Sequence, residues 1–107
     1  MVLYYAPPEA WAGMEDMTEE QKMEGMKPWQ EWMAKCGDAL IDGGSPLMGG
    51  ETMSADGSFS SSTKQVTGYS MLEADSLDGA KDLLAGHPHL MWHEGCEIEV
   101  HPCIPMM

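Results

Sequence analysis

The stretch GYSMLEADSLDGAKDLLAGHPHLMWHEGCEIEVHPCIP, residues 68–105, decides the fold because it predicts a strand, a helix and a strand in succession. Side chains alternate in polarity over residues 69–74 and again over residues 96–103, and a period of two is typical of strands. Between them, residues 77–84 place apolar side chains at the spacing of one helix face. Asp75 or Ser76 can cap this helix, and Gly86 suits the left-handed position after it.

The first half of the chain predicts the same order of elements. Val2–Ala6 is a short apolar strand that ends at two prolines, and residues 9–17 are expected to be irregular. Thr18 and Gln21 fit a capping box that starts a helix ending at Gly37. Pro28 lies within this helix, which therefore either restarts there or bends.

Two short features join the halves and complete the expected fold. Residues 38–42 predict a strand, and Asp56-Gly57 predicts a hairpin turn within residues 51–62. The whole order predicts an α+β, ferredoxin-like βαββαβ domain spanning residues 1–107. Its four-stranded antiparallel sheet would carry two helices on one face.

Composition limits the classes of partner. Five lysines, no arginine and 18 carboxylates give a formal charge of −13, which argues against binding to nucleic acid or to an anionic membrane surface. Three cysteines without a CxxC spacing fit a reducing compartment. The N-terminus lacks the pattern of a secretory signal, and no apolar run reaches the length of a membrane span. We therefore expect a cytoplasmic protein.

Two histidines, His87 and His89, follow the second helix and are candidates for general acid–base catalysis or ligand binding. Both are near a helix C-terminus, where a positive charge is favoured, so the alternative is that they cap carbonyls or face solvent. A metal is a further possibility, because Glu97, Glu99 and His101 alternate along one strand face. A polar strand face explains this alternation more simply, and we expect no metal and no cofactor.

Aromatic and sulfur-containing side chains are concentrated in and around the first helix. Trp29 falls within the apolar stripe and is expected in the core, whereas Trp32 falls at its edge and is expected to line a pocket or an interface. Twelve methionines suit an adaptable apolar cavity.

The segments KPWQEWMAKCGDALIDGGSPL, TGYSMLEADSLDGAKDLLAGHPHL and IEVHPCIPM together resemble the YCII-related domain, a branch of the dimeric α/β-barrel superfamily. The resemblance covers most of the chain except residues 7–17 and 49–62. It implies a ferredoxin-like protomer, a homodimer whose sheets pack face to face, and a pocket between sheet and helix. Most of that family has no assigned biochemical function.

One departure from the family affects the expected site. Short YCII-like proteins have a proposed active-site pair, a histidine in the first helix and an aspartate about ten residues further on. The first helix of this chain contains no histidine, and ungapped placement from Gly37 puts Gly25 and Lys35 near the two positions, where neither can do that job. Asp38 lies close to the second one, so the resemblance carries over only the acid.

Two classes of function remain, since no nucleophile elbow, phosphate loop, dinucleotide fingerprint or zinc spacing is present. The first is a small-molecule-binding or accessory protein, with a pocket between the first helix and the sheet. The alternative is an enzyme that transfers a proton on a small aromatic or carbonyl-containing molecule, with Asp38, His87 or His89 as acid or base. Trp32 and Ser45 are the expected ligand-binding residues of the same pocket.

The sheet itself predicts a homodimer. Two helices cover one face, so the other face would combine Tyr69 and Met71 with the acidic residues of the last strand, and such a mixed face suits a two-fold interface. The terminal residues 104–107 are apolar and could reach the partner subunit. We expect no partner besides a second copy and a small molecule.

Overall fold

A computed structural model describes residues 1–104 of the chain. Its elements are β1 (Val2–Tyr5), α1 (Pro8–Glu15), α2 (Glu19–Cys36), the 3-10 turn η1 (Gly37–Ala39), β2 (Leu40–Asp42), β3 (Glu51–Met53), β4 (Phe59–Ser61), β5 (Val66–Leu72), α3 (Leu77–Leu84), the 3-10 turn η2 (Pro88–Met91) and β6 (Glu97–Val100).

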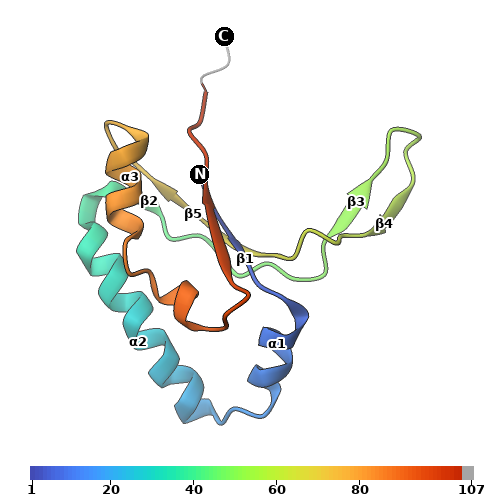
Figure 1. Ribbon diagram of the computed structural model, residues 1–107, viewed down its shortest axis with the longest axis horizontal. Helices are drawn as coiled ribbons and strands as arrows, with labels where there is room; N and C mark the ends of the chain where they lie inside the picture. The colour runs from blue at the N-terminus through green and yellow to red at the C-terminus, as the bar shows by residue number, and fades with distance from the viewer. Residues whose placement is uncertain (105–107) are drawn as a thin grey trace.

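The predicted ferredoxin-like fold is confirmed. Four strands form one antiparallel sheet in the order β2-β5-β1-β6, with β1 and β5 in the centre (Figure 1). Val2 of β1 lies opposite Ser70 on one side and Val100 on the other, which fixes the register of the sheet. The two strand–helix–strand halves therefore interleave, because each central strand pairs with the edge strand of the other half.

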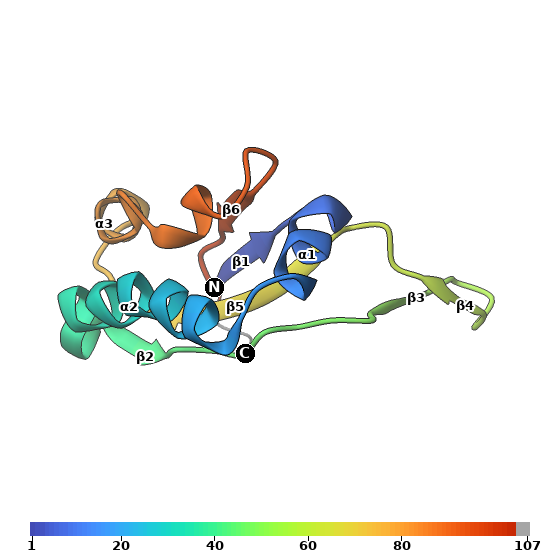
Figure 2. The same cartoon turned by 90° about the horizontal axis from the view of Figure 1, so that it is seen from below.

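The helices α2 and α3 cover one face of this sheet, where the main core lies (Figure 2). Alternate residues of the strands point toward the helices, and the buried members of the core are Val2, Tyr4, Trp32, Cys36 and Leu84. The two helices are also linked directly, since the Trp32 indole N–H donates to the carbonyl of Leu83 over 2.8 Å.

The start of α2 follows the predicted capping box. The Thr18 hydroxyl accepts from the backbone N–H of Gln21, and the Gln21 side chain accepts from the backbone N–H of Thr18. The helix then runs through Pro28 without restarting, so a restart at Pro28 is the wrong alternative. Gly37 ends it with a φ of +55°.

The prediction that residues 9–17 are irregular is wrong, because α1 lies there. Pro8 occupies the first helical position, where its missing N–H costs no hydrogen bond and its fixed φ suits the helix. Ala10 is buried against Ala6 and Cys96, and Trp92 packs on the same small cluster. Docking onto the end of the sheet thus stabilises a helix that its sequence signals weakly.

The predicted hairpin forms a separate two-stranded sheet of β3 and β4, which projects from the rest of the domain (Figures 1 and 2). Met53 pairs with Phe59, and both side chains are exposed. At the turn, the Asp56 carboxylate accepts from the hydroxyl and from the backbone N–H of Ser58, and these bonds, the hydroxyl's most of all, lower the pKa of Asp56.

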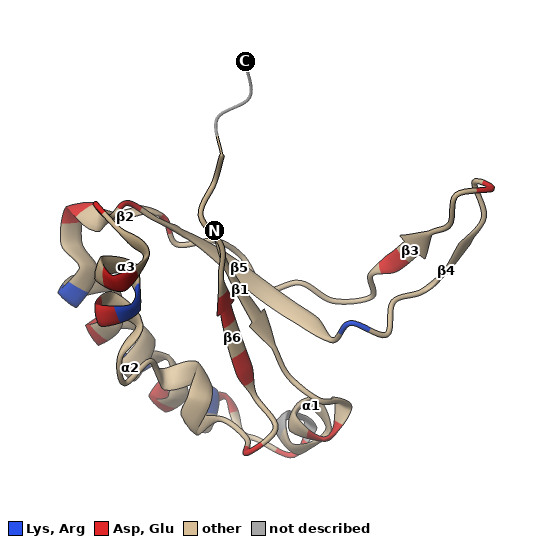
Figure 3. Ribbon diagram, turned by 45° about the horizontal axis from the view of Figure 1, so that its top comes forward, with Lys and Arg blue, Asp and Glu red and all other residues tan. Residues whose placement is uncertain are grey.

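The strand register places Leu3, Tyr5, Tyr69 and Met71 on the second face of the sheet, together with Glu97 and Glu99 of β6. Figure 3 shows these acidic positions along the β6 ribbon. We propose that this face pairs with that of a second copy, because a face that mixes apolar and acidic side chains suits a two-fold interface. Residues 105–107, most of the tail expected to reach a partner, lie outside the described residues. No helix within residues 1–104 has the length and apolar character needed to cross a membrane.

Gly44 sits where a side chain does not fit. Its φ is +82°, and an added Cβ would overlap the carbonyl oxygen of Tyr69. Gly57, at the hairpin turn, also has a positive φ of +89°, but an added Cβ would meet no atom within 4 Å. The first position therefore combines backbone strain with a steric block, whereas the second has strain alone.

We expect Gly57→Ala to lower the free energy of unfolding by about 1–2 kcal/mol, the cost of a left-handed conformation. Gly44→Ala should cost roughly 1–3 kcal/mol more, because the segment after β2 must move away from β5. Urea unfolding of the two variants measures this difference. Equal losses would show that the close approach of Gly44 to β5 contributes nothing.

Candidate functional site

A buried chain of hydrogen bonds crosses the domain beneath α2. The Tyr4 hydroxyl lies 3.2 Å from His87 Nε2 and 2.8 Å from Ser70 Oγ, and Ser70 Oγ donates to the carbonyl of Gly43 over 2.9 Å. His87 and Ser70 have no exposed surface, and Tyr4 is 3% exposed. The chain thus joins the end of α3 to β1, β5 and the segment after β2.

The partners of this chain fix the direction of each hydrogen bond. His87 Nδ1 accepts from the backbone N–H of His89 at 3.0 Å, so in the neutral ring the proton is on Nε2, which donates to Tyr4. Ser70 uses its only proton on the Gly43 carbonyl, so Tyr4 must donate to Ser70. Every donor in the chain therefore has an acceptor, which is the condition for a stable buried polar network.

Burial controls the protonation of these groups. Removal from water, with a smaller contribution from nearby His89, lowers the pKa of His87 to about 4. Burial likewise lowers the pKa of His89, although backbone carbonyls of Tyr5 and Glu97 act in the opposite direction. Burial also raises the pKa of Tyr4 to about 12. At neutral pH the imidazoles of His87 and His89 are therefore neutral, and the phenol of Tyr4 is protonated.

A cleft of about 810 Å³ opens beside this chain, between α2, α1, η2 and the edge of the sheet at Gly43–Pro46. All four tryptophans of the protein line it, together with Tyr4, His89 and several methionines. Trp11 meets Trp92 edge to face at 5.0 Å, and Trp29 meets Tyr4 in the same way at 5.3 Å. The walls are therefore largely aromatic, with His89 between Trp92 and Tyr4.

Comparison with protein families identifies the chain at this point. The family model of the YCII-related domain matches residues 1–104, nearly the whole chain. The protein belongs to the YCII-related family. Searches among curated proteins and among solved structures gave no match.

Three of the predicted site residues of this YCII-related domain, Trp32, Ser45 and His89, line the cleft. Trp32 also belongs to the buried core and is only 5% exposed, which sequence reasoning did not predict, whereas Trp29 is partly buried and packs against that core. The reason is the bond from the Trp32 indole to α3, which draws that ring into the core. Ser45 is exposed, and its hydroxyl donates to the carbonyl of Pro46.

His87 and Asp38 take different places. His87 lies behind the cleft wall, fully buried, and its backbone N–H caps the carbonyl of Leu84. Asp38 is exposed in η1, after α2, and does not line the cleft. Gly25 and Lys35, which fall near the positions of the pair proposed for short YCII-like proteins, both do.

Sequence reasoning missed Tyr4, Trp11 and Trp92. Tyr4 is one residue of an alternating strand, and its polar partners Ser70 and His87 are 66 and 83 positions away. Trp11 belongs to the helix that was not expected, and Trp92 follows η2. The only available signal was two tryptophans that lay outside every predicted strand and helix.

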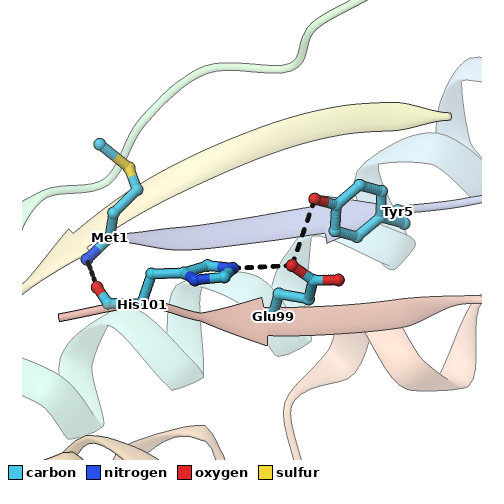
Figure 4. Close-up of polar contacts among 4 residues, drawn as sticks. All are labelled: Met1, Tyr5, Glu99 and His101. Atoms are coloured by element: carbon cyan, nitrogen blue, oxygen red, sulfur yellow. Dashed lines mark hydrogen bonds and ion pairs between the residues drawn. The ribbon is translucent and has the colours of Figure 1, made fainter. Parts of the chain in front are cut away.

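One carboxylate of β6, that of Glu99, is part of a small polar cluster on the open face of the sheet. His101 Nε2 lies 2.7 Å from Glu99 Oε1, and the Tyr5 hydroxyl reaches the same oxygen at 3.5 Å (Figure 4). The amino group of Met1 donates to the His101 carbonyl beside them. Within residues 1–104, no three His, Cys, Asp or Glu side chains are close enough to hold a metal ion.

Removal of the Tyr4 hydroxyl should destabilise the domain. In Tyr4→Phe the buried His87 Nε2–H loses its acceptor, and we expect the free energy of unfolding to fall by about 1–3 kcal/mol. The matched control is Tyr5→Phe, the next residue on the opposite face, whose effect should stay below about 0.5 kcal/mol. Denaturant unfolding of both variants at pH 7 measures the two free energies. A similar decrease in the two variants would show that the buried hydrogen bonds of Tyr4 do not stabilise the domain.

Stability should also depend on pH through His87. Its pKa is lowered from 6.5 to about 4, so the unfolded chain binds a proton more readily and stability falls as the pH drops from about 6.5 to 4. Between pH 7 and pH 5 this group alone should cost about 2 kcal/mol. His87→Gln keeps a donor and an acceptor but does not titrate. From pH 7 to pH 5 its free energy of unfolding should therefore fall by about 2 kcal/mol less than that of the wild type. Parallel pH profiles would contradict the assignment.

Proposed function

We propose that this YCII-related domain binds a small aromatic molecule in the cleft between α2 and the sheet without converting it. The observation that carries the proposal is the gathering of all four tryptophans around one opening, although they come from positions as distant as 11 and 92. Aromatic rings offer faces and edges to a planar ligand at little cost in side-chain entropy. The volume of about 810 Å³ suits a drug-sized molecule.

The polar groups around the cleft favour binding over catalysis because most of them already have partners inside the protein. His89 Nε2 lies 2.9 Å from the Tyr5 carbonyl and must donate to it, since a carbonyl only accepts. Thr67 Oγ1 donates to the Tyr4 carbonyl. The Tyr4 hydroxyl is held between His87 and Ser70. These groups support the aromatic walls more than they offer reactive atoms.

Proton transfer on the bound molecule is the alternative. His89 favours it, because a neutral imidazole at a cleft wall can act as a base. General acid–base chemistry also needs a second polar group at the reacting atom. Asp38, the acid expected from the sequence, does not line the cleft.

The proposal is tested by filling the cleft without weakening the fold. Gly25 lies in α2 on the cleft wall, and an added Cβ there would meet no atom within 4 Å. Gly25→Leu should raise the free energy of unfolding by about 0.5–1 kcal/mol through helix propensity, yet place a bulky side chain in the cleft. Gly13→Leu is the matched control, because Gly13 is also helical and open but does not line the cleft.

A thermal-shift screen of small aromatic acids, amides and amines should give compounds that stabilise the wild type and Gly13→Leu but not Gly25→Leu. The same compounds should alter tryptophan emission. If no compound stabilises the wild type, or if Gly25→Leu responds equally, the proposal fails. Exchange of a ligand carbon-bound proton in deuterated water, followed by NMR, would favour the catalytic alternative, and loss of that exchange in His89→Gln would assign the base.

A further inference from the structure

Three lysines, Lys22, Lys27 and Lys81, lie three positions after an acidic residue, and Lys22 differs from the other two in its contacts. Lys27 pairs with Glu24 at 3.0 Å, and Lys81 pairs with Asp78 at 3.8 Å. Lys22 has Glu19 at the same spacing, yet among the described residues its ammonium group makes no ion pair or hydrogen bond. In a chain of net charge −13, this cation stays available.

The position of Lys22 directs it to the cleft. It begins a stripe on one face of α2 that continues through Met26, Trp29 and Met33, at spacings of four and three residues, and all four line the cleft. Glu31, the only acidic residue of the lining, lies about 180° from Lys22 around the helix. Lys35 also lines the cleft, but it is about 20 Å further along the helix and donates to the Ala85 carbonyl.

Three of the tryptophans that line the cleft also keep an unused hydrogen-bond donor. The indole N–H groups of Trp11, Trp29 and Trp92 have no acceptor among residues 1–104, in contrast to that of Trp32. No buried side-chain nitrogen or oxygen of the described part lacks a partner, so these three N–H groups must be open to solvent. The residues that line the cleft therefore offer aromatic carbon, solvent-accessible indole N–H groups and the unpaired ammonium group of Lys22.

From this arrangement we infer that the ligand is an aromatic anion whose carboxylate or equivalent acidic group binds Lys22 while its ring lies against Trp29 and the facing indoles. The inference rests on the proposed function and adds two details, the charge of the ligand and the residue that binds its charged group. A carboxylate accepts but does not donate, which suits the Lys22 ammonium group and the unused indole N–H groups. The net charge of −13 repels an anionic ligand at long range, and salt screens this repulsion more than the short contact with Lys22. Binding is therefore best measured at moderate salt.

Three probes that share the 2-naphthyl ring separate charge from ring binding: 2-naphthoate, the nearly isosteric neutral 2-naphthamide and the bulkier cationic (2-naphthylmethyl)trimethylammonium. In calorimetric titrations with the whole chain at about 0.15 M salt, we expect 2-naphthoate to bind at least about fivefold more tightly than the amide, the value of one exposed charge pair. Lys22→Gln should remove that preference and leave the affinity for the amide unchanged. Lys64→Gln, another lysine without an ion pair in the described chain but outside the cleft, should keep the preference.

Every other result of these titrations refutes either the anionic ligand or both proposals. Equal or tighter binding of the amide or the ammonium probe by the wild type refutes the anionic ligand, and so does a preference for naphthoate that survives in Lys22→Gln. Both results leave the proposed function standing if Gly25→Leu still blocks the amide. Failure of all three probes to bind the wild type refutes the aromatic ligand and, with it, both proposals. Circular dichroism of the variants guards against a loss of fold, which exposed lysines should not cause.

Discussion

The hydrogen bond between the Tyr4 hydroxyl and His87 Nε2 lies within the main core, where most contacts between the helices and the sheet are apolar. Tyr4 lies on the central strand β1, and His87 follows α3, so the bond fixes the end of a helix over the middle of the sheet. Through Ser70 it also reaches Gly43 and the chain segment that borders the cleft. A domain of 107 residues has a small core, and a fully satisfied polar chain within it selects one arrangement of the surrounding elements.

The protonation of His87 shows which of two opposing effects is larger. A helix C-terminus favours a cation by about 0.3–1 kcal/mol at an exposed site. Full removal of an imidazole from water disfavours the cation by more, and the pKa of about 4 reflects that balance. Trp29 and Trp32 produce the burial, with ring centroids 4.6 Å and 4.3 Å from that of His87. The aromatic wall of the cleft therefore also keeps the buried chain neutral.

Local signals were sufficient to predict most of the fold. The alternating strands, the Thr18 capping box, the Ser76 cap and the turn at Gly57 each depend on neighbours in sequence, and the structure contains all of them. The helix α1 has no such cap and is stabilised by docking of Ala10, which only the folded chain provides. The candidate site was predicted in part for the same reason. Trp32, Ser45 and His89 lie in segments with a family resemblance, whereas the bond of Tyr4 to His87 spans 83 residues.

The two halves of α2 on either side of Pro28 are anchored unequally. The buried residues of the helix, Trp32 and Cys36, both come after the proline, and residues 19–28 are all exposed. Pro28 also lacks the N–H that would bond to the carbonyl of Glu24, so the ladder is interrupted at the boundary. Local opening of the first half consequently exposes little apolar core, and its amide protons should exchange with solvent well before those of the second half. That half supplies Lys22, Gly25 and Met26 to the cleft, so this part of the cleft wall is held less firmly than the part that Trp29 and Trp32 form.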